Sequence, residues 1–246
     1  MFSSVRKRLA WIVFRATQNG QNISKKEFFS ERFIVFPEHR LFVNLIFKNA
    51  NSFLIKVLDE IVNGKNDLDA NTLRNKSLLK VRDLTLPGVL DLSGFDKLVV
   101  VRSPYTRALS SFLDRIGSGR RLEYREIRGY GDPTLEGFKE FLTDLDRGVL
   151  YYDPHFRPQC DQMLFPLSAF TSVIHFERLE SELMSWLRGK FHKDADVSEM
   201  FTRSTRMVNL HQTHADEKVA SFLDVESREL IRRSYRTDFE LLHYPK

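Results

Sequence analysis

"LFVNLIFKNANSFLIKVLDEIV", residues 41–62, joins an apolar run to an amphipathic segment. Residues 41–47 are apolar except for Asn44, which is typical of a strand buried on both faces. Residues 52–62 then carry apolar side chains at helical spacing, at positions 53, 54, 57, 58, 61 and 62. The stretch therefore predicts a buried strand that leads directly into a helix.

The same pattern returns twice along the chain. Residues 97–101 predict a second strand, followed by a helix that begins at Pro104, because the first helical turn tolerates proline. Residues 172–176 predict a third strand, with a helix from about Glu180. Strands that alternate with helices favour an α/β fold, in which a central parallel sheet is flanked by helices. Residues 117–150 suggest an irregular, partly helical excursion, and residues 225–242 one more amphipathic helix.

Composition narrows the class of protein. A single cysteine, Cys160, excludes an internal disulfide and a multi-thiolate metal site. The net charge of +5 favours acidic partners in general. No linker divides the chain, so residues 1–246 are interpreted as one domain, with residues 1–38 as an N-terminal arm or helix. Because residues 9–14 are too few for a signal peptide or a membrane span, we expect a cytoplasmic protein without stable membrane insertion.

The turn at residues 48–52 has the composition of an anion site. Backbone N–H groups at the start of a helix are unpaired donors with a partial positive charge. Lys48 adds a full charge, and Ser52 adds a hydroxyl donor. The turn is not a GxxxxGK[ST] loop, because its lysine comes first instead of last. The alternative interpretation is an ordinary capped turn between a strand and a helix.

A second candidate anion site combines Arg102 and Ser110. Arg102 follows the end of a predicted strand, where α/β proteins bind ligands. Ser110 lies well away from the apolar stripe of its helix, so we do not expect it in the core. An arginine and a serine in this arrangement can bind one phosphate together. A surface arginine and a solvated serine are the alternative.

Two such sites in this order resemble the sulfotransferases, which use the donor 3′-phosphoadenosine 5′-phosphosulfate (PAPS). Lys48, Asn51 and Ser52 match the loop that holds the 5′-phosphosulfate in that family, and Arg102 and Ser110 match the pair that holds the 3′-phosphate. Asn51 stands where the family often has glycine, although asparagine tolerates left-handed backbone. The resemblance implies a P-loop-NTPase-like sulfotransferase fold. The residues assigned to the donor are Lys48, Asn49, Ala50, Asn51, Ser52, Phe53, Arg102, Ser110 and Asn209.

Three further segments are similar to carbohydrate sulfotransferases, the group that includes chondroitin-type enzymes. They are "YYDPHFRPQCDQMLF" (151–165), "VIHFERLESEL" (173–183) and "YRTDFELLHY" (235–244). The resemblance runs from about residue 40 to the C-terminus. It implies that the acceptor is a hydroxyl group of a carbohydrate or glycan and that the product nucleotide is adenosine 3′,5′-bisphosphate.

The resemblance also assigns the catalytic residues. His155 lies in a polar segment between two prolines, and its imidazole can accept a proton from the attacking hydroxyl. Lys48 is expected to stabilise charge on the leaving group. Asp153 or Glu177 is the alternative base. Arg157 is expected either to bind the acceptor or the sulfonate, or to face solvent.

The remaining interpretations concern other ligands. A basic loop with Arg203, Arg206 and Asn209 is expected to lie against the nucleotide. His211 and His214 share a helical spacing, but no third ligand is evident, so no metal is predicted. A P-loop-like nucleotide kinase, which needs Mg²⁺, is the rival enzyme. A basic domain that binds nucleic acid is the rival without catalysis, and we expect no nucleic-acid partner.

Overall fold

The computed structural model describes residues 9–15, 24–64, 68–117, 130, 133–191, 199, 215 and 217–246. These residues form two compact units. The first, called the sheet unit, consists of the described residues within 1–46, 50–101 and 161–209. The second, called the helical unit, consists of the described residues within 47–49, 102–160 and 210–246. That residues 1–246 form a single domain stays a prediction.

The sheet unit contains four hydrogen-bonded strands in the order β1-β2-β3-β4. Their bounds are Phe33–Phe36, Leu41–Asn44, Asp96–Val101 and Ser172–His175. β2, β3 and β4 are parallel, and β1 pairs with β2 in the antiparallel direction. The predicted α/β class with a central parallel sheet is therefore confirmed, with one antiparallel strand added. β2 ends three residues earlier than predicted, although Leu45 and Ile46 beyond it are also buried.

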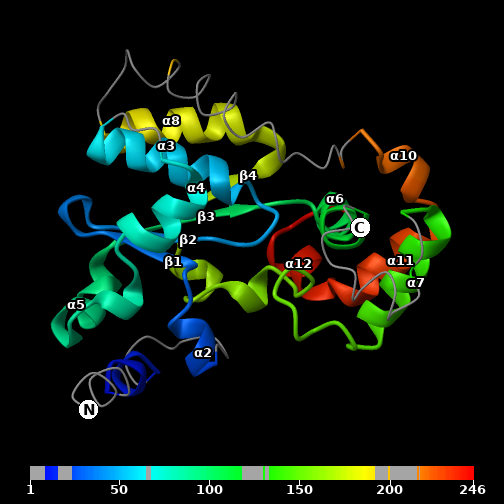
Figure 1. Ribbon diagram of the computed structural model, residues 1–246, viewed down its shortest axis with the longest axis horizontal. Coiled ribbons are helices and arrows are strands. Elements are labelled where there is room, and N and C mark those ends of the chain that lie inside the picture. The colour runs from blue at the N-terminus through cyan, green and yellow to red at the C-terminus, as the bar shows by residue number, and fades with distance from the viewer. Residues whose placement is uncertain are drawn as a thin grey trace. The chain divides into compact units, whose positions relative to one another are not determined.

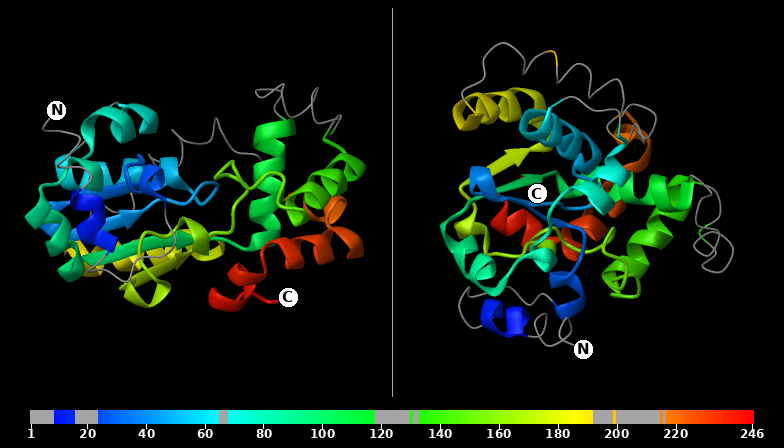
Figure 2. Two further views of the ribbon diagram at one scale, coloured as in Figure 1. Left: turned by 90° about the horizontal axis from the view of Figure 1, so that it is seen from below. Right: turned by 60° about the vertical axis from the view of Figure 1, so that its left-hand side comes forward.

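Two helices cover one face of this sheet (Figures 1 and 2). They are α3 (Asn51–Asn63) and α8 (Leu179–Phe191). Their apolar stripes form one core with inward-facing strand residues such as Val43, Leu98 and Ile174. Both helices were predicted from their hydrophobic period, and both begin one residue before the predicted start.

Aromatic side chains cover the other face of the sheet. Phe33 and Phe42 lie on neighbouring strands with ring centroids 6.2 Å apart, and Phe42 makes an edge contact of 5.1 Å with Phe165. Phe165 in turn contacts Phe14, which lies in the helical residues 9–15. These N-terminal residues are thereby packed into the sheet unit. The remaining α-helices of this unit are α2 (Lys25–Phe28), α4 (Ala70–Thr72) and α5 (Leu86–Asp91).

The helical unit has its own aromatic core. Phe112, Phe138, Phe141 and Phe222 form ring contacts with centroids 5.1–6.3 Å apart, and all are buried. α7 and α11 pack side by side in this unit (Figure 2). Its α-helices are α6 (Pro104–Phe112), α7 (Leu135–Asp146), α10 (Val219–Phe222), α11 (Val225–Ser234) and α12 (Arg236–Leu241).

Three predictions about this unit need correction or refinement. The helix predicted over residues 225–242 is two helices, because the chain leaves the helical path at Tyr235, whose hydroxyl bonds a distant loop. Ser110 is 2% exposed and therefore buried, since α6 is enclosed on nearly all sides and not only on its apolar stripe. The excursion at 117–150 contains the regular helix α7. Within the described part of the chain, no helix is long and apolar enough to cross a membrane.

Candidate active site

The turn after β2 has an unusual backbone. Lys48 has φ = 70° and Ala50 has φ = 57°, both in the left-handed region. Left-handed backbone costs about 1–2 kcal/mol for a residue with a Cβ atom. Asn51, at which the sequence suggested this conformation, is instead the first residue of α3. Turns with left-handed residues can present successive N–H groups as a concave anion site.

Lys48 is held among charged side chains of the helical unit. Its side chain is 15% exposed, and its Nζ lies 3.4 Å from a carboxylate oxygen of Asp114. Burial lowers the pKa of Lys48, the ion pair with Asp114 opposes that shift, and the nearby cations Arg102 and Arg115 add to it. The ammonium is thus less strongly solvated than that of a surface lysine, and Asp114 partly balances its charge.

Arg102 fixes the same turn. It is 4% exposed, and its Nη1 donates to the carbonyl oxygen of Lys48 at 3.2 Å. Its Nε donates to Oγ1 of Thr106 at 3.0 Å. Arg102 therefore also packs within the helical unit, whereas the sequence suggested a residue placed only for ligand contact. Ser110 lies two helical turns further along α6, in the same unit.

Gln159 connects three segments of the helical unit. Its Oε1 accepts from Nδ2 of Asn49 at 2.7 Å and from the backbone N–H of Arg102 at 2.9 Å. Its Nε2 donates to the carbonyl of Arg102 at 2.7 Å and to Asp238 at 3.3 Å. Gln159 and Asn49 are fully buried. One amide thus holds both candidate anion-binding segments, and sequence reasoning missed it.

The tail segment 235–244 makes hydrogen bonds to residues 156–160. The buried carboxylate of Asp238 accepts from the backbone N–H groups of Gln159 at 2.7 Å and Cys160 at 2.9 Å. The hydroxyl of Tyr235 donates to the carbonyl of Phe156 at 2.8 Å. Burial raises the pKa of Asp238, against the effect of these amide donors and of a nearby arginine. The tail therefore anchors the loop that carries His155.

Arg107 is a second residue that the sequence did not single out. It is fully buried, and its guanidinium donates to the carbonyls of Phe47 at 3.1 Å and His155 at 3.4 Å. Ser111 donates to the same His155 carbonyl at 2.9 Å. Arg107 thus joins the turn that precedes Lys48 to the loop of the candidate base. Nothing in its sequence position distinguished it from a surface arginine of the same helix.

His155 lies within the helical unit with 12% of its side chain exposed. Its ring lies 3.9 Å from that of Phe47, and its Nδ1 is 2.7 Å from Oδ1 of Asp153. An ionised carboxylate only accepts, which assigns the proton to Nδ1 and the lone pair to Nε2. Burial and Arg115 lower the pKa of His155, whereas Asp153 raises it. The imidazole is therefore neutral near pH 7 and can act as a base.

The other residues that the sequence predicted for substrate or donor binding lie as follows. Nε and Nη2 of Arg157 donate to the carbonyls of Tyr151 and Tyr152, at 2.5 and 3.3 Å. Ser52 is exposed at the start of α3, whereas the Phe53 side chain belongs to the core of the sheet unit. A donor contact of Phe53 would therefore use its backbone. The late-loop residues Arg203, Arg206, Asn209, His211 and His214 lie outside the described residues.

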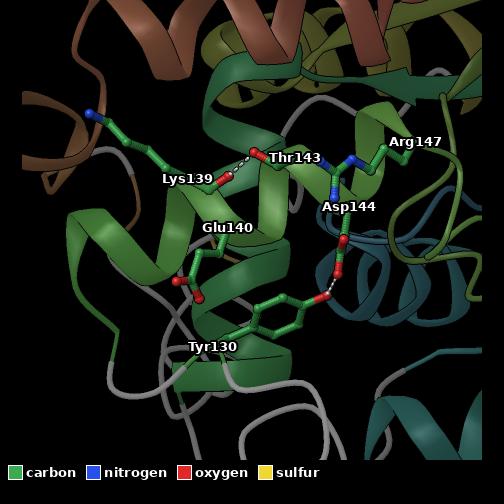
Figure 3. Close-up of a pocket in the computed structure, with 6 residues that line it drawn as sticks. All are labelled: Tyr130, Lys139, Glu140, Thr143, Asp144 and Arg147. Atoms are coloured by element: carbon green, nitrogen blue, oxygen red, sulfur yellow. Dashed lines mark hydrogen bonds between the residues drawn. The ribbon is translucent and has the colours of Figure 1, made fainter.

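One open pocket lies elsewhere in the helical unit, along α7 (Figure 3). Within the pocket the hydroxyl of Tyr130 donates to Asp144 at 2.9 Å, and Thr143 donates to the carbonyl of Lys139 at 2.8 Å, whereas Nζ of Lys139 lies 2.6 Å from Asp224 outside it. None of the predicted site residues lines it. The pocket along α7 is therefore separate from the candidate residues Lys48 and His155.

Two buried cations and a neutral imidazole on an α/β fold are features of an enzyme that transfers an anionic group. The chain belongs to the sulfotransferase family, which it matches over residues 31–245. No curated protein and no solved structure matched the chain. Family membership confirms the sulfotransferase resemblance and assigns the protein to sulfuryl transfer in general.

Proposed function

We propose that the protein transfers the sulfuryl group of PAPS to a hydroxyl group of a carbohydrate or glycan. The observation that carries the proposal is the pairing of His155 with Asp153 in the same unit as Lys48 and Arg102. A base, a partner that orients it and two cations are the groups that sulfuryl transfer to an alcohol requires.

The donor fits the cations of the helical unit. Lys48 and Arg102 are both largely buried, and the bond from Arg102 to the Lys48 carbonyl holds their segments together. We assign Lys48 to the 5′-phosphosulfate, and Arg102 with Ser110 to the 3′-phosphate. The assignments of Asn51, Ser52 and Asn209 rest on the sequence resemblance alone.

The reaction is an in-line displacement at sulfur. PAPS supplies an activated sulfuryl group, whose bond to the 5′-phosphate oxygen breaks as the acceptor oxygen forms its bond to sulfur. Nε2 of His155 takes the hydroxyl proton, while Asp153 keeps the other ring nitrogen protonated and stabilises the imidazolium. Lys48 stabilises the negative charge that develops on the departing phosphate oxygen.

Support for a carbohydrate acceptor comes from the loop that carries the base. Tyr151 and Tyr152 are 47% and 56% exposed, four and three residues before His155. Exposed aromatic rings provide apolar faces on which a sugar ring can stack. The Arg157 guanidinium lies 5.2 Å from the Tyr151 ring and is positioned to pair with an acidic sugar.

Transfer of ³⁵S from labelled PAPS to a panel of neutral and acidic glycans tests the proposal. We expect labelled glycan with the wild-type protein and about 10²–10⁴-fold slower labelling with His155→Ala. Calorimetry with adenosine 3′,5′-bisphosphate, ATP–Mg²⁺ and single-stranded DNA tests the donor separately. Tighter binding of ATP–Mg²⁺ or DNA than of the bisphosphate would overturn the assignment of PAPS, and labelling of non-carbohydrate alcohols alone would overturn the glycan.

A further inference from the structure

The end of α6 departs from regular α-helical geometry beside the candidate catalytic residues. After Phe112 the helix continues as a π-helical turn over Leu113–Gly117. Such turns are rare, and they occur frequently at functional sites. This one carries two consecutive charged residues, Asp114 and Arg115.

Each of the two charged residues contacts a different catalytic group. Asp114 lies 3.4 Å from Nζ of Lys48. Nη2 of Arg115 lies 2.6 Å from Nε2 and 2.7 Å from Nδ1 of His155. The carboxylate of Asp114 is farther from Nε of Arg115, at 4.0 Å. Asp114 and Arg115 therefore lie closer to Lys48 and His155, respectively, than to each other.

These contacts lie in a poorly solvated region. The side chains of Lys48, Asp114, Arg115 and His155 are 15%, 24%, 18% and 12% exposed. Partial burial strengthens electrostatic interactions, because water screens them less. A surface ion pair would have little influence on its neighbours, but a pair in this setting affects both catalytic groups.

We propose that Asp114 and Arg115 are positioning residues for sulfuryl transfer, with Asp114 orienting the Lys48 ammonium and Arg115 holding the His155 ring in place. This inference rests on the proposed function. Nη2 of Arg115 lies almost equally far from the two ring nitrogens, so the guanidinium contacts the imidazole as a whole and not Nε2 alone.

The charges around His155 predict the sign of the effect. Asp153 on its own loop and Asp114 on the π-helical turn favour imidazolium, whereas burial and Arg115 disfavour it. The hydrogen bond from Arg107 to His155 goes to the backbone carbonyl and not to the ring, and the Phe47 ring covers one face of the imidazole. Removal of the Arg115 charge should therefore let His155 protonate at a higher pH.

The test compares Arg115→Gln, Arg115→Lys and wild type in two measurements. In the pH dependence of kcat, the acid limb should move to higher pH in Arg115→Gln and return toward the wild-type position in Arg115→Lys. Titration of the His155 ring by NMR should move in the same direction, and it does not require activity. Arg115→Met provides a second neutral side chain if Arg115→Gln does not fold.

Asp114 is tested through the separation of kcat from donor binding. Asp114→Asn should lower kcat about tenfold, equivalent to one lost charge-assisted contact, while the Kd for adenosine 3′,5′-bisphosphate changes by less than about threefold. Asp114→Glu should recover part of the loss. Equal losses in kcat and in affinity would overturn the orienting role of Asp114.

The matched control is Arg233→Gln, which removes one positive charge from the same unit. Arg233 pairs with Asp146 at 3.0 Å and is exposed, so this change should leave the titration of His155 in place. Unchanged titration of His155 in Arg115→Gln would overturn the role of Arg115. If the titration of His155 shifts as expected but neither the wild type nor any variant transfers sulfate, the effect of Arg115 on His155 is supported and the proposed function is wrong.

Discussion

Nδ2 of Asn49 donates a 2.7 Å hydrogen bond to Oε1 of Gln159, and both residues are fully buried. The same oxygen accepts from the backbone of Arg102. Because a buried polar group without a partner costs about 1–3 kcal/mol, Gln159 contributes to stability and fixes the segments proposed to bind the donor.

Replacement of Gln159 should therefore affect both folding and binding. Gln159→Leu should lower the free energy of unfolding by about 1–3 kcal/mol and weaken adenosine 3′,5′-bisphosphate binding about tenfold. The matched control is Gln162→Leu, since Gln162 is also fully buried but accepts from Arg32 in the sheet unit. Urea denaturation and calorimetry would separate the two effects. Equal loss of affinity in both variants would contradict a specific role for Gln159.

The bond between Tyr235 and Phe156 leads to a prediction about turnover. Tyr235→Phe removes a 2.8 Å hydrogen bond to the residue that follows His155, so the base loses part of its support. We expect kcat to fall several-fold, and stability to fall by about 1 kcal/mol, with donor affinity retained. Tyr130→Phe removes a hydrogen bond to Asp144 on α7 and should leave kcat unchanged. A similar fall in kcat for both variants would point to general destabilisation.

His155 should make both rate and stability depend on pH. His155→Ala should lower turnover about 10²–10⁴-fold with little change in donor affinity, the usual range for a general base. Burial lowers the pKa of His155, so the acid limb of the wild-type rate should lie below about pH 6.5, the ordinary imidazole value, and should vanish in the variant. If Asp153→Asn abolishes turnover while His155→Ala retains it, the carboxylate is the base.

The same shift has a consequence for folding. The unfolded chain binds the imidazole proton more readily than the folded protein, so stability from His155 is present above the ordinary imidazole pKa and is lost as the pH falls through it. Acidification from pH 7 to 5 should therefore destabilise the wild type more than His155→Asn, as measured by thermal unfolding. An identical pH dependence in the two proteins would argue against a buried neutral imidazole.

The strand–turn–helix units could be predicted from the sequence because their signal is local. The apolar run at residues 41–47 and the helical spacing that follows it depend on neighbours within a few positions. β2 accordingly begins where the pattern predicts it, although it ends three residues earlier, and α3 begins one residue before its predicted start. In the turn after β2 the left-handed residues are Lys48 and Ala50, and a local pattern does not predict them. The carbonyl of Lys48 is held by a bond from Arg102, 54 positions away.

The supporting residues of the site could not be predicted for the same reason. Gln159 and Asp238 are 79 positions apart, and Arg107 bonds carbonyls 60 and 48 positions away. Polar side chains usually lie at the surface, so their types give no sign of burial. Ser110 shows the limit of helical periodicity, which assumes that a helix has one solvent-exposed side.

Lys48 should act on the transition state more than on donor binding. Its ammonium is assigned to the charge that develops on the leaving oxygen, and such a contact strengthens only as the bond breaks. Lys48→Ala should therefore reduce kcat more than it reduces donor affinity. The control is Lys56→Met, because Lys56 is also buried, donates to the carbonyl of Leu68, and should affect stability alone. Loss of affinity with unchanged kcat would make Lys48 a simple binding residue.

Ser110 and Ser111 provide the sharpest test of the 3′-phosphate assignment. They are adjacent buried serines on α6, 2% and 0% exposed, but Ser111 donates to the His155 carbonyl at 2.9 Å. Ser110→Ala should reduce the preference for adenosine 3′,5′-bisphosphate over AMP, because only the former nucleotide carries the phosphate assigned to Ser110. Ser111→Ala should lower turnover and leave that preference in place.

Arg102→Ala should abolish most of the preference for adenosine 3′,5′-bisphosphate over AMP. The loss of one charge-assisted contact should weaken binding of the bisphosphate about 10- to 100-fold. It also removes the bond to the Lys48 carbonyl, so some stability should be lost with it, which Ser110→Ala avoids. Calorimetry of both nucleotides with the three variants measures the preference directly. If Ser110→Ala and Arg102→Ala discriminate between the nucleotides as well as the wild type does, the 3′-phosphate binds elsewhere, although the assignment of His155 and Lys48 would be unaffected.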